Sequence, residues 1–207
     1  MIRVVDAAFV TTATALAQCP RDPVPEVAFV GRSNVGKSSM INALAHRRKL
    51  VRVSNTPGRT RTLNFFDVTL EHRGAKRIVR LCDLPGYGFA KVSKAERRGF
   101  LEMIGEYLEG RTTLKVVVSI IDAVVGPTPD DLEMLSNLET LAPQILVAAT
   151  KVDRIPPSRR QGRIVTLTKA LGLPDGAVVG FSATEGIGLE IVWGGVLEAM
   201  GEPKASL

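Results

Sequence analysis

A glycine-rich segment lies between an apolar run and a helical pattern near the start of this chain. The segment 31–44, GRSNVGKSSMINAL, has two glycines five positions apart, and Lys37 and Ser38 follow the second. The β-branched run EVAFV at 26–30 precedes it, and strand, loop and helix in this order are typical of a phosphate-binding loop. Glycines let successive N–H groups point at one anion, and the helix N-terminus adds its dipole. The sequence therefore predicts a site for a nucleoside triphosphate.

The side chains of this loop have roles that follow from their chemistry. Lys37 brings a positive charge to the outer phosphates and is a predicted catalytic residue. The Ser38 hydroxyl is a predicted ligand of Mg²⁺. The predicted phosphate-binding residues are Gly31, Arg32, Ser33, Asn34, Val35, Gly36, Lys37 and Ser38.

Short β-branched runs alternate with helical patterns along the rest of the chain. In one of these runs Phe66, Val68 and Leu70 alternate with polar residues, which predicts a half-exposed strand. The run at 77–83 follows a short HRGAK turn, so the two runs form a predicted hairpin. Strands are predicted at 26–30, 62–70, 77–83, 114–122, 144–151 and 177–183.

Helix boundaries are indicated by capping residues and by apolar spacing. Ser93 and Glu96 form a predicted capping box for a helix that ends at Gly110. Thr128 as N-cap and Pro129 at the first helical position begin another helix. Further helices are predicted from the loop to about Arg48, over 158–171 and over 188–200, and the buried stripe of the helix after Pro129 is predicted to be Leu132, Leu135, Leu138 and Leu141.

The alternation of strands and helices predicts a three-layer α/β fold of the P-loop NTPase type. Its central sheet is mostly parallel with one antiparallel edge hairpin, and helices cover both faces. A length of 207 residues with 45% hydrophobic residues fits a single domain over 1–207, with 1–25 as an N-terminal extension packed on it. Cys19 and Cys82 are too few for a disulfide framework, and no apolar run is long enough to span a bilayer. We expect a cytoplasmic protein without membrane attachment.

Two short motifs at predicted strand ends favour guanine as the base. Asp153, in the TKVD motif, accepts hydrogen bonds from the guanine N1–H and exocyclic amine, a donor pair that adenine lacks. The stem of Lys151 lies along the base plane, and the Ala183 amide meets guanine O6. The predicted base-binding residues are Thr150, Lys151, Val152 and Asp153, with Phe181, Ser182 and Ala183 from the FSA motif.

The DLPG motif follows another predicted strand and indicates a response to the third phosphate. Asp83 holds a water molecule on Mg²⁺, and the Gly86 amide binds the γ-phosphate. The first switch segment, residues 54–65, supplies a threonine for the metal, and Thr60 and Thr62 both qualify by chemistry. The predicted nucleotide-binding residues here are Asp83, Leu84, Pro85 and Gly86, of which Gly86 is also a catalytic candidate.

The motifs GRSNVGKSSMINAL, TPGRTRTLNFF, DLPGYGFAKVS, TKVD and FSA together resemble the EngB family of bacterial GTPases, also called YihA or YsxC. The resemblance extends from about Phe9 to the last helix. It implies a monomeric, Ras-like GTPase that binds GTP, GDP and Mg²⁺. It also implies a role in assembly of the large ribosomal subunit, in contact with its rRNA, and a link to cell division and septation. The family pattern assigns the Mg²⁺ threonine to Thr60 and nucleotide contacts to Gly58, Arg59, Thr60, Arg61 and Thr62.

Two positions depart from the pattern of many other GTPases. Thr150 stands where many have Asn, although EngB proteins commonly use Thr. Tyr87 stands where many have a water-orienting Gln, so intrinsic hydrolysis is expected to be slow. Asn34 is a catalytic candidate through a bound K⁺ that offsets charge between the phosphates, and the competing interpretation is that it only stabilises the loop.

Basic residues surround the predicted switch and base-binding segments in a chain of net charge +6. They predict an RNA-facing side that makes phosphate contacts. The alternatives are a small regulatory GTPase with a non-ribosomal protein partner and a P-loop kinase or ATPase, which TKVD and FSA argue against. The basic residues are Arg47, Arg48, Lys49, Arg52, Arg59, Arg61, Lys91, Lys94, Arg97, Arg98, Arg154, Arg159, Arg160 and Arg163.

Overall fold

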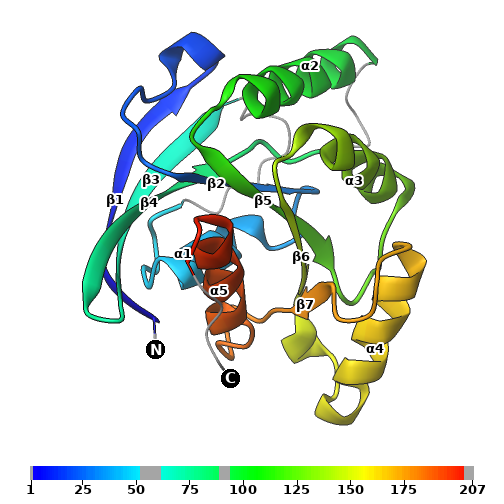
Figure 1. Ribbon diagram of the computed structural model, residues 1–207. Coiled ribbons are helices and arrows are strands. Elements are labelled where there is room, and N and C mark those ends of the chain that lie inside the picture. Colours follow the sequence, from blue (N-terminus) through cyan, green and yellow to red (C-terminus); the bar gives the residue numbers. More distant parts are fainter. Residues whose placement is uncertain (1, 52–61, 89–93, 203–207) are drawn as a thin grey trace.

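The central sheet places the strand that enters the glycine loop between two parallel neighbours. The computed structural model describes residues 2–51, 62–88 and 94–202. Its seven-stranded sheet has the order β1-β3-β4-β2-β5-β6-β7 (Figure 1). The strands are β1 (Ile2–Ala13), β2 (Glu26–Gly31), β3 (Leu63–His72), β4 (Ala75–Asp83), β5 (Leu114–Asp122), β6 (Ile145–Thr150) and β7 (Val178–Gly180).

The direction of the strands confirms the predicted fold class. β2 pairs in parallel with β4 and β5, and β6 continues the parallel part to β7. β3 runs antiparallel to both β4 and β1. The helices are α1 (Lys37–Leu44), α2 (Lys94–Gly110), α3 (Pro129–Leu141), α4 (Pro157–Ala170) and α5 (Leu189–Ala199), with short 3₁₀ turns η1 (Leu16–Gln18) and η2 (Val152–Arg154).

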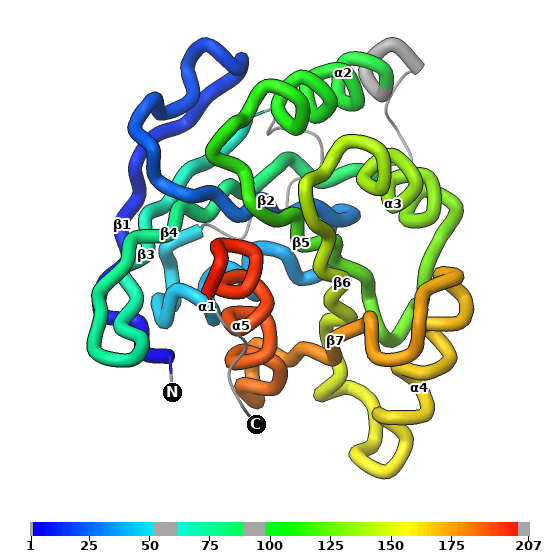
Figure 2. Tube along the Cα trace, in the orientation of Figure 1, coloured from blue at the N-terminus to red at the C-terminus, as the bar shows by residue number. Residues whose placement is uncertain are grey.

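Helices cover both faces of this sheet, and alternate residues of β2 show the two cores. Val27 and Phe29 belong to the core cluster on the side of α1 and α5, and Ala28 and Val30 to the cluster with α2 and α3. Helices α1 and α5 lie together on one face, and α2, α3 and α4 lie on the other (Figures 1 and 2). Because both faces of β2 are buried, its sequence is continuously apolar after Glu26 rather than alternating.

The β3–β4 hairpin confirms the predicted antiparallel pair. Its two-residue turn has positive φ at Arg73 (51°) and Gly74 (78°), as turns matching the twist of a hairpin require. The alternation read from the sequence is real: Phe66, Val68 and Leu70 are buried and the polar residues between them are partly exposed.

Strand β1 was not predicted, because two β-bulges interrupt its period-2 pattern. The register with β3 shifts between Val4 and Asp6 and again between Phe9 and Thr11. Each shift moves the following side chains to the other face of the sheet, which hides the alternation. Residues 1–25, expected as a packed extension, therefore contribute this edge strand.

A buried arginine fixes the connection from β1 to β2. The Arg80 guanidinium on β4, 2% exposed, donates to the carboxylates of Asp22 and Asp67 at 2.7–2.8 Å. Pairing a buried guanidinium with two carboxylates offsets its desolvation. Asp22 lies in the connection itself, so this pairing ties the connection to the sheet.

Several predicted boundaries and one predicted core residue are wrong. α1 ends at Leu44 rather than near Arg48, because the backbone turns left-handed at His46 (φ 48°). β7 spans three residues of the predicted 177–183. Leu132 is 43% exposed, and Met134 belongs to the buried stripe in its place.

The capping box of Ser93 and Glu96 lies outside the residues whose side chains the structure describes. No helix in the described part of the chain combines the length and apolar character needed to cross a membrane. Cys19 and Cys82 are both free and buried, so neither forms a disulfide here.

Candidate nucleotide-binding site

The predicted motifs meet at the carboxyl edge of the parallel strands. The glycine loop follows β2, the DLPG motif follows β4, TKVD follows β6 and FSA follows β7. These four strands run in the same direction, so the segments that leave their carboxyl ends gather on one side of the sheet. Ligands of open α/β sheets bind at this edge, next to the strand where the order reverses, which here is β2.

The glycine loop has the backbone that an anion site requires. Asn34 and Gly36 have positive φ, at 63° and 108°. A Cβ at Gly31 would lie 2.9 Å from Val35 Cγ1 and 3.0 Å from the Ile120 carbonyl oxygen, so only glycine fits there. Gly36 is the N-cap of α1, whose first turn has no acidic residue to compete for the helix N-terminus. The loop therefore offers backbone N–H groups and a helix dipole to phosphate.

Lys37, predicted to act on the outer phosphates, and Asp83, predicted to act through water on Mg²⁺, are in direct contact. The Lys37 ammonium of α1 forms an ion pair with the Asp83 carboxylate at the end of β4, and both side chains are about nine-tenths buried. The contact places DLPG beside the phosphate loop, as the motifs require.

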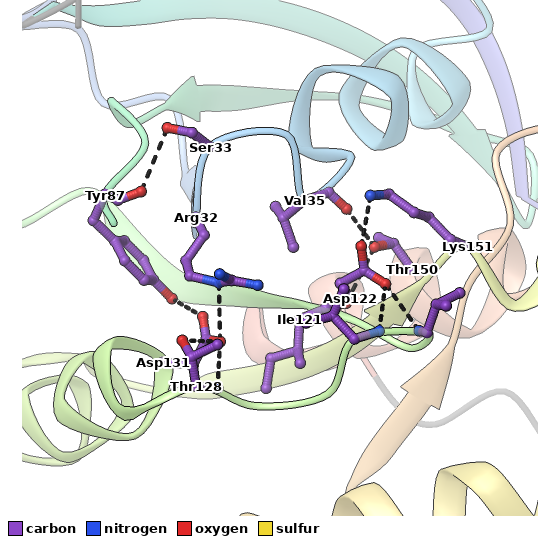
Figure 3. A network of polar contacts seen from close by, with 12 residues as sticks. Arg32, Ser33, Val35, Tyr87, Ile121, Asp122, Thr128, Asp131, Thr150 and Lys151 are labelled. Carbon is purple, nitrogen blue, oxygen red and sulfur yellow. Dashed lines mark hydrogen bonds and ion pairs between the residues drawn. The ribbon is translucent and has the colours of Figure 1, made fainter. Parts of the chain in front are cut away.

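The predicted base-binding segment 150–153 is tied to the phosphate loop by two side chains. The Thr150 hydroxyl lies 2.5 Å from the Val35 carbonyl oxygen and 3.1 Å from that of Ile121 (Figure 3). The Lys151 ammonium donates to the Asn34 carbonyl at 2.8 Å. Thr150 thus joins β5, β6 and the loop through its hydroxyl.

Lys151 has a second partner, Asp122 at the end of β5. Its ammonium lies 2.6 Å from Asp122 Oδ2, and Asp122 Oδ1 accepts from the N–H groups of Val124 and Val125. Burial acts to raise the pKa of Asp122, but the Lys151 hydrogen bond and the two backbone donors outweigh it and lower that pKa. The carboxylate stays ionised and holds the stem of Lys151 in place.

The FSA segment lies against TKVD. The Phe181 N–H donates to the Ala149 carbonyl at 2.8 Å, and the Val152 N–H donates to the Phe181 carbonyl at 3.3 Å. Hydrogen bonding from the Ser182 hydroxyl lowers the pKa of Asp153, and burial opposes it. Asp153 is therefore an ionised acceptor at neutral pH, as recognition of two guanine donors requires.

The DLPG motif continues along the outer side of the phosphate loop. The Ser33 N–H donates to the Tyr87 carbonyl at 3.0 Å, and the Tyr87 N–H donates to the Gly31 carbonyl at 3.3 Å. A Cβ at Gly86 would lie 3.0 Å from Ser33 Oγ, so the chain passes very close to the loop.

The donors for a magnesium ion are described only in part. The Ser38 hydroxyl in the first turn of α1 and the Asp83 carboxylate are hard oxygen donors of the type that Mg²⁺ takes. Their position beside the phosphate loop fits the ion. Gly58, Arg59, Thr60 and Arg61 lie outside the described residues, and Thr62 is described only as the partly buried residue before β3. The described residues hold no group of three or more His, Cys, Asp or Glu that forms a metal site.

Two functional candidates were missed from the sequence, Asp122 and Asp131. Asp131 of α3 contacts Tyr87 and Arg32 (Figure 3). Both had a signal: Asp122 ends a buried strand at the ligand edge, and Asp131 stands three residues before Met134 on the apolar stripe of its helix. An acid on such a stripe needs partners.

Comparison with known families and proteins gives a consistent result. Residues 26–151 match the family described as "50S ribosome-binding GTPase". A protein of Myxococcus xanthus strain DK1622, described as "Probable GTP-binding protein EngB", is 58% identical over 202 residues, which cover 98% of each chain. A protein of Lactobacillus gasseri with the same description is 41% identical over 201 residues, 96% of this chain and 100% of the relative.

Solved structures show the same fold. The crystal structure of a probable GTP-binding protein EngB is similar with a TM-score of 0.61 at 24% identity, covering 86% of this chain and 99% of that one. The structure of Era in complex with MgGDPNP and nucleotides 1506–1542 of 16S ribosomal RNA is similar with a TM-score of 0.68 at 27% identity, covering 89% of this chain and 59% of Era.

Proposed function

The chain belongs to the EngB family of GTP-binding proteins, and we propose that it is a nucleotide-gated switch in assembly of the large ribosomal subunit. It is a P-loop GTPase. The observation that supports the ribosomal role is the match of 26–151 to a family described by binding to the 50S subunit. Normal cell division and septation would then depend on it. The proposal includes a monomer whose residues 1–207 form one GTP-binding domain in the cytoplasm.

We propose that the nucleotide is held by the segments gathered at the carboxyl edge. Backbone N–H groups of 31–38 bind the phosphates, and Lys37 neutralises their outer charge. Asp153 accepts from the guanine donors, while Lys151, held by Asp122, lies along the base. The Gly86 amide binds the γ-phosphate, which links that phosphate to the chain that follows.

Ser38 and Thr60 are the proposed protein ligands of Mg²⁺, and Asp83 would act on the ion through a water molecule. The bound ion would supply positive charge against the phosphate oxygens. Lys37 forms an ion pair with Asp83, so the positive charge of one side chain offsets the negative charge of the other. The contact orients the carboxylate toward the phosphate loop.

We propose that hydrolysis by the protein alone is slow. The Tyr87 ring stands where other GTPases place a water-orienting amide, and its hydroxyl is bonded to Asp131 instead. Asn34 is the proposed residue beside a K⁺ ion. It is exposed in the loop, and its main-chain carbonyl accepts a hydrogen bond from the Lys151 ammonium. Replacing NaCl with KCl at constant ionic strength tests this: faster hydrolysis supports it, and an equal rate contradicts it.

The proposed contact with ribosomal RNA relies on basic side chains near the nucleotide site. Arg48, Lys49, Arg154 and Arg159 are exposed. Arg160 pairs with Glu185, and the Arg163 side chain donates to the carbonyls of Ala123 and Val124, so these two are engaged within the chain. Arg47 pairs with Asp6. The RNA contacts are therefore assigned to the first four and to Arg98 of α2, which is also exposed. Arg52, Arg59, Arg61 and Lys91 lie outside the described residues, and so do the side chains of Lys94 and Arg97.

Sedimentation with purified large ribosomal subunits tests the function. The protein is pelleted with a non-hydrolysable GTP analogue or with GDP at the same salt concentration, because electrostatic binding depends on salt. Pelleting with the analogue and not with GDP is expected. Arg154→Glu combined with Arg159→Glu should reduce pelleting while nucleotide binding is retained. Equal or absent pelleting of the wild-type protein contradicts the ribosomal role and favours a regulatory GTPase with another protein partner.

A further inference from the structure

The residue after the DLPG motif is held by a helix on the far side of the loop. The Tyr87 side chain is 7% exposed, and its hydroxyl donates to Asp131 Oδ1 of α3 at 2.8 Å (Figure 3). Burial raises the pKa of Tyr87, and the charge of Asp131 raises it further, so the hydroxyl stays a donor. Tyr87 is thus directed into the protein and away from water.

Asp131 is buried in a set of donors that use both of its oxygens. Its side chain is 1% exposed. Oδ2 accepts from the N–H and the hydroxyl of Thr128, both at 2.8 Å, and lies 3.2 Å from Arg32 Nε. Removing one partner of a buried, hydrogen-bonded charge is costly, so the arrangement is rigid.

The backbone around Tyr87 is held equally closely. Residues 32 and 87 form a parallel bridge, with hydrogen bonds from Ser33 N–H to Tyr87 O and from Tyr87 N–H to Gly31 O. Gly88 has φ 76°, and a Cβ there would lie 3.1 Å from Arg32 Cδ. The Asp131 carboxylate therefore contacts side chains from both strands of this bridge, Arg32 and Tyr87.

We propose that Asp131, through Tyr87 and Arg32, is a positioning residue that fixes the Gly86 amide for the third phosphate. Gly86 precedes Tyr87 directly, so any movement of Tyr87 moves the peptide that presents this amide. Fixing it in advance removes the entropy that ordering would cost on binding. The inference depends on the nucleotide site described above and is independent of the ribosomal role.

The expected effect of this positioning is selective for the triphosphate. GDP has no γ-phosphate to meet the Gly86 amide, so loosening Tyr87 costs GDP little. A ligand shifts the equilibrium between two conformations only by the difference in its affinity for them. Loss of the Asp131 contact should therefore lower the affinity for GTP relative to GDP rather than both together.

The test measures the affinities of fluorescent GDP and of a fluorescent non-hydrolysable GTP analogue for Tyr87→Phe and Asp131→Asn. The analogue should bind each variant about fivefold more weakly or worse, while GDP affinity changes by less than about twofold. In steady state the KM for GTP should rise more than kcat falls. Tyr107→Phe is the matched control, because the Tyr107 hydroxyl, also buried, donates to the Glu26 carboxylate at 3.0 Å outside this network.

Three results would overturn the inference. First, the ratio of the two affinities in Tyr87→Phe could equal that of the wild type. Second, Tyr87→Phe could bind the analogue more tightly than the wild type does. Third, Tyr107→Phe could change the ratio as much as Tyr87→Phe, which would assign the effect to general destabilisation. Wild-type protein that binds neither nucleotide would instead overturn the site itself, and thermal unfolding of each variant shows whether Asp131→Asn is folded when its affinities are read.

Discussion

The two ends of the nucleotide site are held in different ways. At the base end, side chains reach directly to the phosphate loop: the Thr150 hydroxyl and the Lys151 ammonium each contact a loop carbonyl. At the γ-phosphate end, backbone groups of Tyr87 pair with the loop, and the Tyr87 hydroxyl fixes them to Asp131. In the proposed complex, the side chains at the base end meet the same groups in GDP and GTP, and the Gly86 amide at the other end meets a phosphate that only GTP has.

This difference predicts which contacts set the affinity for both nucleotides and which set the preference between them. Contacts common to GDP and GTP raise both affinities and shift no equilibrium between states. Selectivity for GTP has to come from the segment beside the γ-phosphate. Substitutions at the base end should therefore change both affinities together, and substitutions around Tyr87 should change their ratio.

The largest effect is expected from Lys37→Ala, which affects the phosphates of both nucleotides. The variant loses the positive charge that faces the outer phosphates. It also leaves the buried Asp83 carboxylate without its ion-pair partner. We expect both affinities to fall about 100-fold, or about 3 kcal/mol. Fluorescence titration with labelled GDP and GTP analogue measures this, and a loss smaller than about threefold for both would contradict the assignment.

Asp153→Asn should have the next largest effect and should alter base preference. Asparagine presents an amide in place of one carboxylate oxygen and repels one of the two guanine donors. Affinity for GDP and GTP should fall about 30-fold, or about 2 kcal/mol, and xanthosine nucleotides should gain affinity because their 2-oxo group accepts from the amide. Competition titrations with GTP, XTP and ATP measure the order. Unchanged preference for guanine would refute the role of Asp153.

Thr150→Val should affect the base end of the site alone. The substitution keeps the shape but leaves the Val35 carbonyl without its 2.5 Å partner. We expect both affinities to fall about tenfold with their ratio unchanged, since an unsatisfied buried acceptor costs about 1–3 kcal/mol. A change in ratio comparable to that in Tyr87→Phe would remove the distinction between the two ends.

The smallest effect is expected far from both ends, at Asp22. The hydrogen bond from Arg80 lowers the pKa of Asp22 below its ordinary 3.8, so its contribution to stability is present above pH 3.8 and is lost as the pH falls through the folded-state value. Because Asp22 is 50% exposed, Asp22→Asn should lower the free energy of unfolding by less than about 1 kcal/mol at pH 7.

Urea unfolding followed by circular dichroism at pH 7 and pH 3 measures this contribution. The difference between wild type and Asp22→Asn should narrow at the lower pH, and nucleotide affinities at pH 7 should stay equal. A difference that widens on acidification would show that the ion pair with Arg80 does not stabilise the folded state.

Local motifs were predictable from the sequence because their chemistry lies in adjacent residues. The glycine spacing at 31–38 predicted the loop, and the apolar alternation predicted the hairpin of β3 and β4. The structure contains both features, with positive φ at Gly36 in the loop and at Gly74 in the hairpin turn. The base-binding roles of 150–153 and 181–183, inferred in the same way, stay predictions that the titrations above address.

Features that depend on distant residues were not predictable. Strand β1 pairs with β3 some 60 positions later, and its bulges at Val5 and Val10 break the period that would have indicated a strand. In the sequence, Asp131 stands out only as an acid in the first turn of its helix, where it favours the helix dipole. Its contact with Tyr87 exists because the sheet brings α3 beside the DLPG segment, 44 positions earlier in the chain.

Hydrogen–deuterium exchange with GDP and with the non-hydrolysable analogue shows which segment responds to the γ-phosphate. We expect peptides covering 82–88 to exchange more slowly with the analogue than with GDP, and peptides covering 148–154 to exchange equally with both and more slowly than without nucleotide. Equal exchange of 82–88 in the two complexes, or a difference confined to 148–154, would contradict the assignment of the γ-phosphate response to the segment held by Tyr87 and Asp131.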